Sequence, residues 1–192
     1  MPDSAATSVA HSRPPPAPSR LAPLTLVLGG ARSGKSEYAE SLLDAHHAPI
    51  YLATAQGRDA EMEERIARHR ARRGRHWTVV ESPHHLAASL IAAAAPDRPI
   101  LVDCLTIWLA NLMGAREPVA IETERLLSAL PGLASPVVLV ANEVGLGIVP
   151  DNALARAFRD HAGTLNQRLA AICQRVVFIA AGLPLILKDE WK

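Results

Sequence analysis

The residues best suited to chemistry form an octet near the start of the sequence, with the pattern G-x-x-x-x-G-K-[ST]. Its members are Gly29, Gly30, Ala31, Arg32, Ser33, Gly34, Lys35 and Ser36. Glycines let the backbone turn tightly and bring its amides onto phosphate oxygens, and the N-terminus of a following helix attracts anions. Lys35 would supply positive charge at the β- and γ-phosphates, and Ser36 would ligate Mg²⁺. The octet predicts a nucleoside triphosphate site, against the alternative of a glycine-rich turn that binds nothing.

A carboxylate is expected to complete the Mg²⁺ shell from the end of a neighbouring strand. Asp103 suits this role, because it ends the apolar run at residues 100–102. Ligands of parallel sheets bind where the carboxyl ends of the strands meet, and that edge would hold both Asp103 and the octet. The same aspartate could instead cap the helix expected after it, and the two roles are compatible.

The segment 59–73 runs from acidic to basic residues, which is typical of a surface helix whose charges complement its dipole. However, Met62, Ile66 and His69 recur at helical spacing, so His69 is expected to point toward the protein. The neighbouring arginines would keep its imidazole neutral and therefore nucleophilic. From spacing alone, a structural histidine is still the commoner outcome.

A glycine-rich loop at residues 141–150 follows another apolar run. It is expected at the same edge of the sheet, where a mobile lid over the substrate would lie. A plain connector has the same composition, and the sequence does not separate these two interpretations.

The composition is ordinary for a soluble globular protein, with 49% hydrophobic residues, 20% charged residues and a net charge of +1. A charge so close to zero argues against nucleic acid as a partner. Cys104 and Cys173 lie in apolar runs and are expected to be buried thiols, which suits a reducing cytoplasm. No apolar run reaches the roughly 18 residues of a membrane span, and we expect no signal peptide.

Residues 1–23 are rich in Pro, Ala and Ser, which predicts a disordered extension ahead of one folded domain at residues 24–192. Buried strands are expected at residues 24–28, 49–53, 77–80, 100–103, 137–140 and 176–179. Helices are expected near residues 35–46, 59–73, 84–95, 104–113, 119–130 and 152–174. This alternation predicts an α/β fold, with a mostly parallel sheet and helices on both faces.

Taken together, these pieces resemble the bifunctional adenosylcobinamide kinase / adenosylcobinamide-phosphate guanylyltransferase family of cobalamin biosynthesis. The matching segments are GGARSGKS at 29–36, YLATAQ at 51–56, EMEERIARHRARR at 61–73, HWTVVESP at 76–83, ILVDCLTIWLANLM at 100–113 and VLVANEVGLGIVPDNALARAFRDHAGTLNQRLAA at 138–171. The last of these is far more specific than the phosphate loop. The resemblance covers nearly all of residues 24–188 and implies a P-loop NTPase (RecA-like) architecture.

The resemblance implies two reactions. ATP or GTP phosphorylates adenosylcobinamide, and GTP then transfers GMP to the new phosphate through a covalent GMP–histidine, which the alignment places at His69. Lys35 would be the second catalytic residue. The nucleotide contacts implied beyond the octet are Ala53, Thr54, Ala55, Arg70, Ala71, Arg72, Arg73, Glu81 and Asp103. The resemblance also implies a homotrimer.

Two other functions are compatible with the phosphate loop. Another small P-loop kinase would use the loop and Asp103, but it would have no need of His69. A nucleotide-gated interaction module would bind nucleotide with negligible turnover. The sequence leaves open the preferred phosphate donor and whether one nucleotide site serves both reactions, and the loop at 142–150 is our first guess for the corrinoid pocket.

Overall fold

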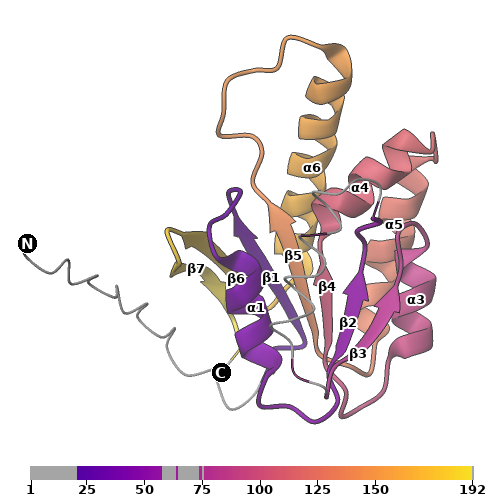
Figure 1. Ribbon diagram of the computed structural model, residues 1–192, viewed down its shortest axis with the longest axis vertical. Coiled ribbons are helices and arrows are strands. Elements are labelled where there is room, and N and C mark those ends of the chain that lie inside the picture. The colour runs from indigo at the N-terminus through magenta and orange to yellow at the C-terminus, as the bar shows by residue number, and fades with distance from the viewer. Residues whose placement is uncertain (1–20, 58–63, 65–73, 75, 192) are drawn as a thin grey trace, which may run out of the picture.

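The computed structural model describes residues 21–57, 64, 74 and 76–191. They form one seven-stranded sheet with the order β3-β2-β4-β5-β1-β6-β7 (Figure 1). The strands are β1 (Leu24–Gly29), β2 (Ile50–Ala53), β3 (Thr78–Glu81), β4 (Ile100–Asp103), β5 (Val137–Asn142), β6 (Arg175–Ala180) and β7 (Leu183–Asp189). Their pairings are parallel except for the antiparallel β6–β7 pair. The predicted α/β fold with a mostly parallel sheet is therefore confirmed.

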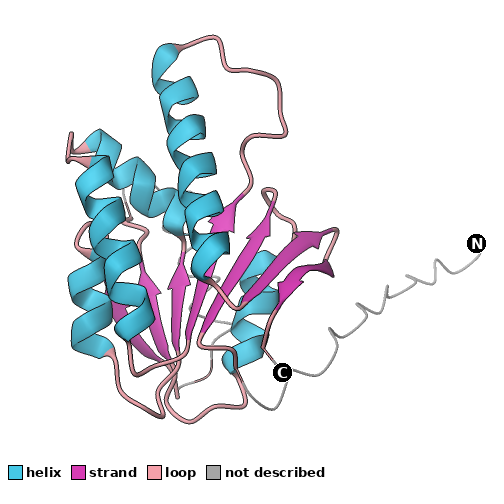
Figure 2. Ribbon diagram, turned by 180° about the vertical axis from the view of Figure 1, so that it is seen from behind, coloured by secondary structure: helices cyan, strands magenta, loops and turns pink. Residues whose placement is uncertain are grey.

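Helices cover both faces of the sheet (Figures 1 and 2). They are α1 (Lys35–Leu43), α3 (Leu86–Ala93), α4 (Leu105–Gly114), α5 (Val119–Ala129) and α6 (Ala153–Ile172), and a short 3-10 helix spans Leu130–Gly132. Helix α1 packs on one face, where Leu42 and Leu43 join a cluster with Val27 and Val138. The other helices cover the opposite face, where Trp108 and other apolar residues form the larger core cluster.

The strands in the centre of the sheet explain why the sequence shows continuous apolar runs. Both β1 and β5 have helices on each side, and β1 is buried along its whole length. Since neighbouring residues of a strand face opposite ways, Leu26 lies in the larger cluster while Val27 lies against α1. A strand with two buried faces has no polar positions, so its sequence does not alternate.

Strand β7 is the main departure from the predicted elements, because no strand is predicted there from the sequence. It forms a hairpin with β6 through a two-residue turn, in which Ala181 (φ 50°) and Gly182 (φ 79°) have left-handed backbone conformations. Its short apolar run contains Pro184, and a sheet tolerates proline at an edge strand such as this one. Several of its apolar side chains are exposed, so the strand lacks the buried pattern on which the other predictions depend.

The other predicted elements agree with the structure to within two residues at each end, with two exceptions. Helix α1 ends at Leu43 and not at residue 46, because the chain turns there ahead of Ala48, which has a φ of 48°. The helix predicted at 59–73 lies outside the described residues, apart from Glu64.

The start of the folded domain also lies slightly earlier than the predicted boundary at Leu24. Leu21 and Ala22 are 8% and 1% exposed, and Leu21 packs in the cluster under α1. Ordered packing thus includes at least part of the segment predicted to be an extension. Residues 1–20 of that segment lie outside the described residues.

The two cysteines are free and buried, as predicted. Burial raises the pKa of the Cys104 thiol to about 11, with a further contribution from the charge of Asp103. Burial likewise raises the pKa of the Cys173 thiol to about 12. Among the described helices, none has both the length and the apolar character that crossing a lipid bilayer requires.

The core packing predicts a large difference between two leucine variants. Leu26 is fully buried in the centre of the sheet, whereas Leu187 on β7 is 56% exposed. Leu26→Ala is expected to lower the free energy of unfolding by about 2–5 kcal/mol, because it removes buried methyl groups and leaves a cavity. Leu187→Ala is expected to change it by about 0.5 kcal/mol or less. Urea denaturation measures both, and equal losses would contradict this assignment of the core.

Candidate active site

The predicted phosphate loop lies between the end of β1 and the start of α1. Gly34 is the N-cap residue of α1, with a φ of 94°, and no described side chain caps this helix. An uncapped helix N-terminus of this kind is suited to bind an anion. Lys35 is 5% exposed, and its Nζ donates a hydrogen bond to the Gly30 carbonyl oxygen over 3.0 Å. The lysine side chain thus folds back over the loop that is predicted to hold the phosphates of a nucleotide.

Two glycines of this loop lie against the backbone of neighbouring elements. A Cβ at Gly29 would lie 2.6 Å from the carbonyl oxygen of Ile179 and 2.6 Å from Ser33 Oγ. A Cβ at Gly34 would lie 3.3 Å from the Cα of Gly182, in the β6–β7 turn. The Gly182 amide also donates to the Ser33 carbonyl oxygen over 2.8 Å. The hairpin that the sequence did not predict therefore supports the phosphate loop.

Asp103 ends β4, which is separated from β1 by β5 alone. Its Oδ2 accepts a hydrogen bond from the Tyr51 hydroxyl over 3.0 Å. Helix α4 takes Cys104 as its N-cap residue, without a hydrogen bond from a capping side chain, so the alternative of Asp103 as a helix cap is wrong. Burial and the charge of Asp103 raise the pKa of the Cys104 thiol, and the positive charge of Lys35 offsets a small part of that rise.

Thr54 holds the segment after β2 to the segment after β4. It is fully buried, and its Oγ1 both donates to the Cys104 carbonyl oxygen and accepts from the Cys104 amide, each over 2.8 Å. Its amide donates to the Asp103 carbonyl oxygen, and its own carbonyl oxygen accepts from Asn111 Nδ2 over 2.8 Å. Every polar group of Thr54 is thus used within the protein, which favours a supporting role over the predicted nucleotide contact.

The other predicted nucleotide contacts in the described residues lie farther along the same edge. Ala53 pairs with Glu81 on one side and with Asp103 on the other, so the carboxyl ends of three strands form a row. Glu81 is exposed and Ala55 is partly buried. Because β3 lies four strands from β1, Glu81 and Gly29 are separated by about 19 Å at the usual strand spacing. The predicted contacts therefore divide into two groups. The inner group is the phosphate loop with Asp103, and the outer group lies at the ends of β2 and β3.

The remaining predicted residues are His69, Arg70, Ala71, Arg72 and Arg73, and all five lie outside the described residues. Residues 54–57, which precede that segment, follow the carboxyl end of β2. The chain therefore enters the segment from the same edge as the outer group.

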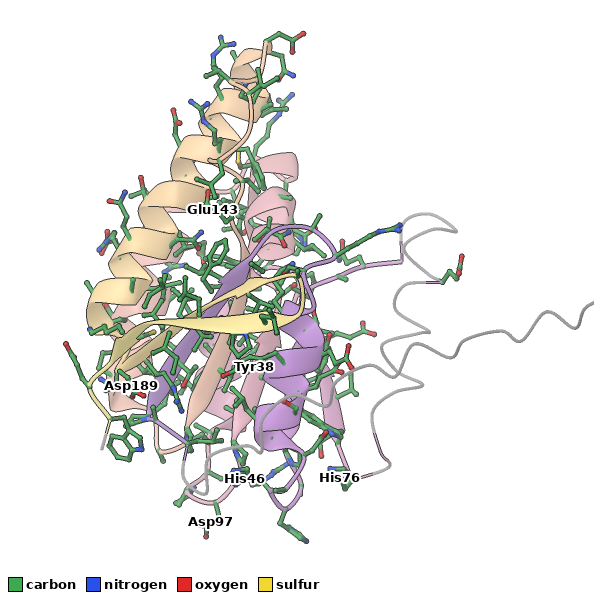
Figure 3. The ribbon with its side chains drawn as sticks, turned by 90° about the vertical axis from the view of Figure 1, so that its left-hand side faces the viewer. Tyr38, His46, His76, Asp97, Glu143 and Asp189 are labelled. Atoms are coloured by element: carbon green, nitrogen blue, oxygen red, sulfur yellow. The ribbon has the colours of Figure 1, made fainter. Side chains whose placement is uncertain are left out.

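The loop between β5 and α6 begins beside the phosphate loop. The Glu143 amide donates to the Gly29 carbonyl oxygen over 3.1 Å, and the loop then rises beside α6 (Figures 1 and 3). Leu146 is 83% exposed and Ile148 is 97% exposed, so the loop presents apolar side chains to solvent. Asn152 caps α6 where the loop ends. A plain connector has no need of these exposed apolar residues, which favours a contact with substrate.

Comparison with known proteins identifies the family of this chain. The model of the cobinamide kinase / cobinamide phosphate guanyltransferase family matches residues 25–187. The chain belongs to this family. It is accordingly an enzyme, and its phosphate loop lies in the part of the chain that the family model covers.

Curated relatives of this family cover most of the chain. The bifunctional adenosylcobalamin biosynthesis protein CobP of Pseudomonas aeruginosa is 51% identical over 168 residues, covering 86% of this chain and 97% of that protein. The bifunctional adenosylcobalamin biosynthesis protein CobU of Salmonella typhimurium is 41% identical over 180 residues, covering 86% of this chain and 99% of that protein.

Solved structures show a similar fold at low sequence identity. The RadB recombinase is 19% identical, with a TM-score of 0.50, over 82% of this chain and 75% of that one. An ATPase of a bacterial type III secretion system is 12% identical, also with a TM-score of 0.50, over 87% of this chain and 56% of that one. Both similarities concern the fold alone, and this fold agrees with the architecture expected from the sequence.

The close approach at Gly29 predicts different effects of two alanine substitutions in the phosphate loop. Gly29→Ala forces a Cβ to within 2.6 Å of the Ile179 carbonyl oxygen, so the loop must shift. We expect its affinity for Mg²⁺–GTP to fall at least about tenfold, because the loop amides lose their alignment on the phosphates. Gly30→Ala is the matched control, since its Cβ would meet no atom within 4 Å. Titration with a fluorescent GTP analogue measures both, and equal affinities would contradict the prediction.

Proposed function

We propose that this protein phosphorylates adenosylcobinamide with ATP or GTP and then transfers GMP from GTP to the product. The final products are adenosylcobinamide-GDP and pyrophosphate. The observation that carries the proposal is the complete phosphate loop, placed on the same sheet edge as Asp103, in a chain of the cobinamide kinase / cobinamide phosphate guanyltransferase family. The names of the relatives, which describe bifunctional proteins of adenosylcobalamin biosynthesis, support both halves.

The phosphoryl transfer would take place at the inner group of residues. Lys35 and the amides at the start of α1 would spread the charge that develops on the γ-phosphate. Ser36 and Asp103 offer a hydroxyl and a carboxylate, which are the oxygen ligands that Mg²⁺ prefers. A metal ion held by these two residues would supply positive charge that offsets the charge of the phosphates. The hydrogen bond from Tyr51 orients the Asp103 carboxylate for this purpose.

The guanylyl transfer would use His69, which the family resemblance identifies as the nucleophile. Its imidazole nitrogen would attack the α-phosphorus of GTP, and pyrophosphate would leave. The phosphate of adenosylcobinamide phosphate would then attack the same phosphorus and release the histidine. Two in-line displacements replace one difficult transfer between phosphates.

Further nucleotide contacts would come from the outer group. The residues proposed are Ala53, Ala55, Arg70, Ala71, Arg72, Arg73 and Glu81. The distance across the sheet between Glu81 and Gly29 suits contacts with parts of a nucleotide remote from the phosphate loop, or a second nucleotide. Thr54 would act here by supporting its neighbours, because its polar groups are already bonded.

The corrinoid acceptor would contact the loop after β5, whose exposed apolar side chains include Leu146 and Ile148. We also propose a homotrimer in the cytoplasm. The exposed apolar residues Leu183 and Leu185 on the edge strand β7 support self-association, because an edge strand with such residues favours contact with another chain.

The first test concerns His69. Incubation with α-labelled GTP and Mg²⁺ is expected to leave label on the protein that is labile in acid and stable in base, as a phosphoramidate is. His69→Ala should abolish this label, because the nucleophilic nitrogen is removed. His161→Ala is the control, since His161 is an exposed residue of α6 and should leave labelling unchanged. Undiminished label in His69→Ala would refute the histidine assignment, and a small P-loop kinase without guanylyl transfer predicts no label at all.

The second test concerns Lys35. Lys35→Ala is expected to lower the rate of phosphorylation of adenosylcobinamide by at least about 100-fold, because it removes the buried positive charge that would stabilise the phosphates. Lys188→Ala, on β7, is the matched control and should retain activity. Transfer of label from γ-labelled ATP or GTP to the corrinoid measures the rate. Unchanged activity in Lys35→Ala would refute its role, and nucleotide binding without turnover in the wild type would favour an interaction module.

A further inference from the structure

Asn142, the last residue of β5, has its backbone held by side chains from two helices. Its amide donates a hydrogen bond to Thr106 Oγ1 over 2.7 Å, from α4. Its carbonyl oxygen accepts one from Asn166 Nδ2 over 3.3 Å, from α6. Two polar side chains thus fix the position of a residue at the end of a strand, which fixes the direction of its own side chain.

Asn142 lies between the phosphate loop and Asp103. Strand β5 pairs Asn142 with Gly29 of β1 on one side and Val140 with Asp103 of β4 on the other. Val138 and Val140 belong to the core cluster under α1. Because side chains alternate along a strand, the Asn142 side chain is on the same face as α1, the helix that begins at the phosphate loop.

The side-chain oxygen of Asn142 is buried, and it has no hydrogen-bond partner among the described residues. A buried acceptor without a donor is unfavourable, so such a group at a binding edge calls for a donor from a ligand. Phosphate oxygens only accept, which excludes them as the partner. Donors that such a site can offer are a hydroxyl group of the substrate or of the nucleotide and a water molecule.

The surroundings favour a substrate hydroxyl. The chain that directly follows Asn142 exposes Leu146 and Ile148, a surface suited to a large, partly apolar molecule and not to a hydrated ion. Glu143, the next residue, directs its Oε1 to the amide of Gly145 within the loop. Of Asn142 and Glu143, it is therefore Asn142 whose side-chain oxygen is left for a ligand beside the phosphate loop.

We propose that Asn142 Oδ1 accepts a hydrogen bond from the substrate hydroxyl that is to be phosphorylated. This bond would direct the hydroxyl oxygen toward the γ-phosphorus. In this step the hydroxyl oxygen bonds to the γ-phosphorus while the bond from that phosphorus to the bridging oxygen breaks. The nucleoside diphosphate leaves with the electron pair of the broken bond. The hydroxyl proton stays in the hydrogen bond to Asn142 Oδ1 until the new bond forms, and it is then released to solvent water. This role rests on the proposed kinase activity, and it adds a substrate-contacting residue to it.

Two substitutions test this role. Asn142→Ala removes the oxygen, and we expect kcat for phosphorylation of adenosylcobinamide to fall about 10- to 100-fold, while the Kd for Mg²⁺–nucleotide changes less than about threefold. Asn142→Asp keeps an oxygen in the same place. Once ionised, the new carboxylate accepts the same hydrogen bond, so kcat of Asn142→Asp should exceed that of Asn142→Ala at pH 8. As the pH is lowered and the carboxylate is protonated, kcat should fall, which adds an acidic limb to its pH profile. A purely structural residue would not give such a limb.

The guanylyl half of the reaction is the internal control. Labelling by α-labelled GTP needs no acceptor hydroxyl, so Asn142→Ala should label as the wild type does, which also shows that the variant is folded. An unchanged kcat in Asn142→Ala would overturn the inference, and so would an Asn142→Asp variant no more active than Asn142→Ala. A large loss of Mg²⁺–nucleotide affinity would assign Asn142 to a metal-bound water instead. Absence of phosphorylation by the wild type would refute the proposed function itself.

Discussion

The sheet edge that holds the phosphate loop depends on a close approach of backbones that only residues without side chains allow. Gly29 ends β1 so near the carbonyl oxygen of Ile179 that a Cβ would collide with it, and Gly34 lies against Gly182 in the β6–β7 turn. The phosphate loop is therefore supported by the hairpin of β6 and β7. Its shape follows from contacts between segments about 150 residues apart in the sequence.

The other half of the edge is held by hydrogen bonds between buried polar groups. Thr54 and Asn111 bind the segments that follow β2, β3 and β4, and their partners are mostly backbone atoms. Buried polar groups must be paired, so these bonds fix the ends of three strands relative to one another. Asp103 and Glu81 consequently lie in one row, even though each comes from a different strand.

Both proposed reactions would use this one edge of the sheet. Phosphoryl transfer would take place at the phosphate loop and Asp103, and the outer strands would add further nucleotide contacts. Asn142 stands at the inner part, with its backbone fixed by Thr106 and Asn166 and its side-chain oxygen left for a ligand. The same rigid sheet thus aligns groups from β1, β4 and β5 without any of them being close in sequence.

The sequence by itself determined the fold class, the position of the glycine-rich loop between a strand and a helix, and the position of Asp103 at the end of a strand. These depend on local patterns, namely continuous apolar runs, a glycine-rich turn and a carboxylate that ends an apolar run. The sequence did not reveal strand β7, whose apolar residues are exposed at an edge and include Pro184. Nor did it show that Thr54 is fully bonded or that the Asn142 oxygen is not. Those facts were decided by tertiary structure, because whether a polar atom is satisfied depends on neighbours that only the pairing and packing of distant segments bring to it.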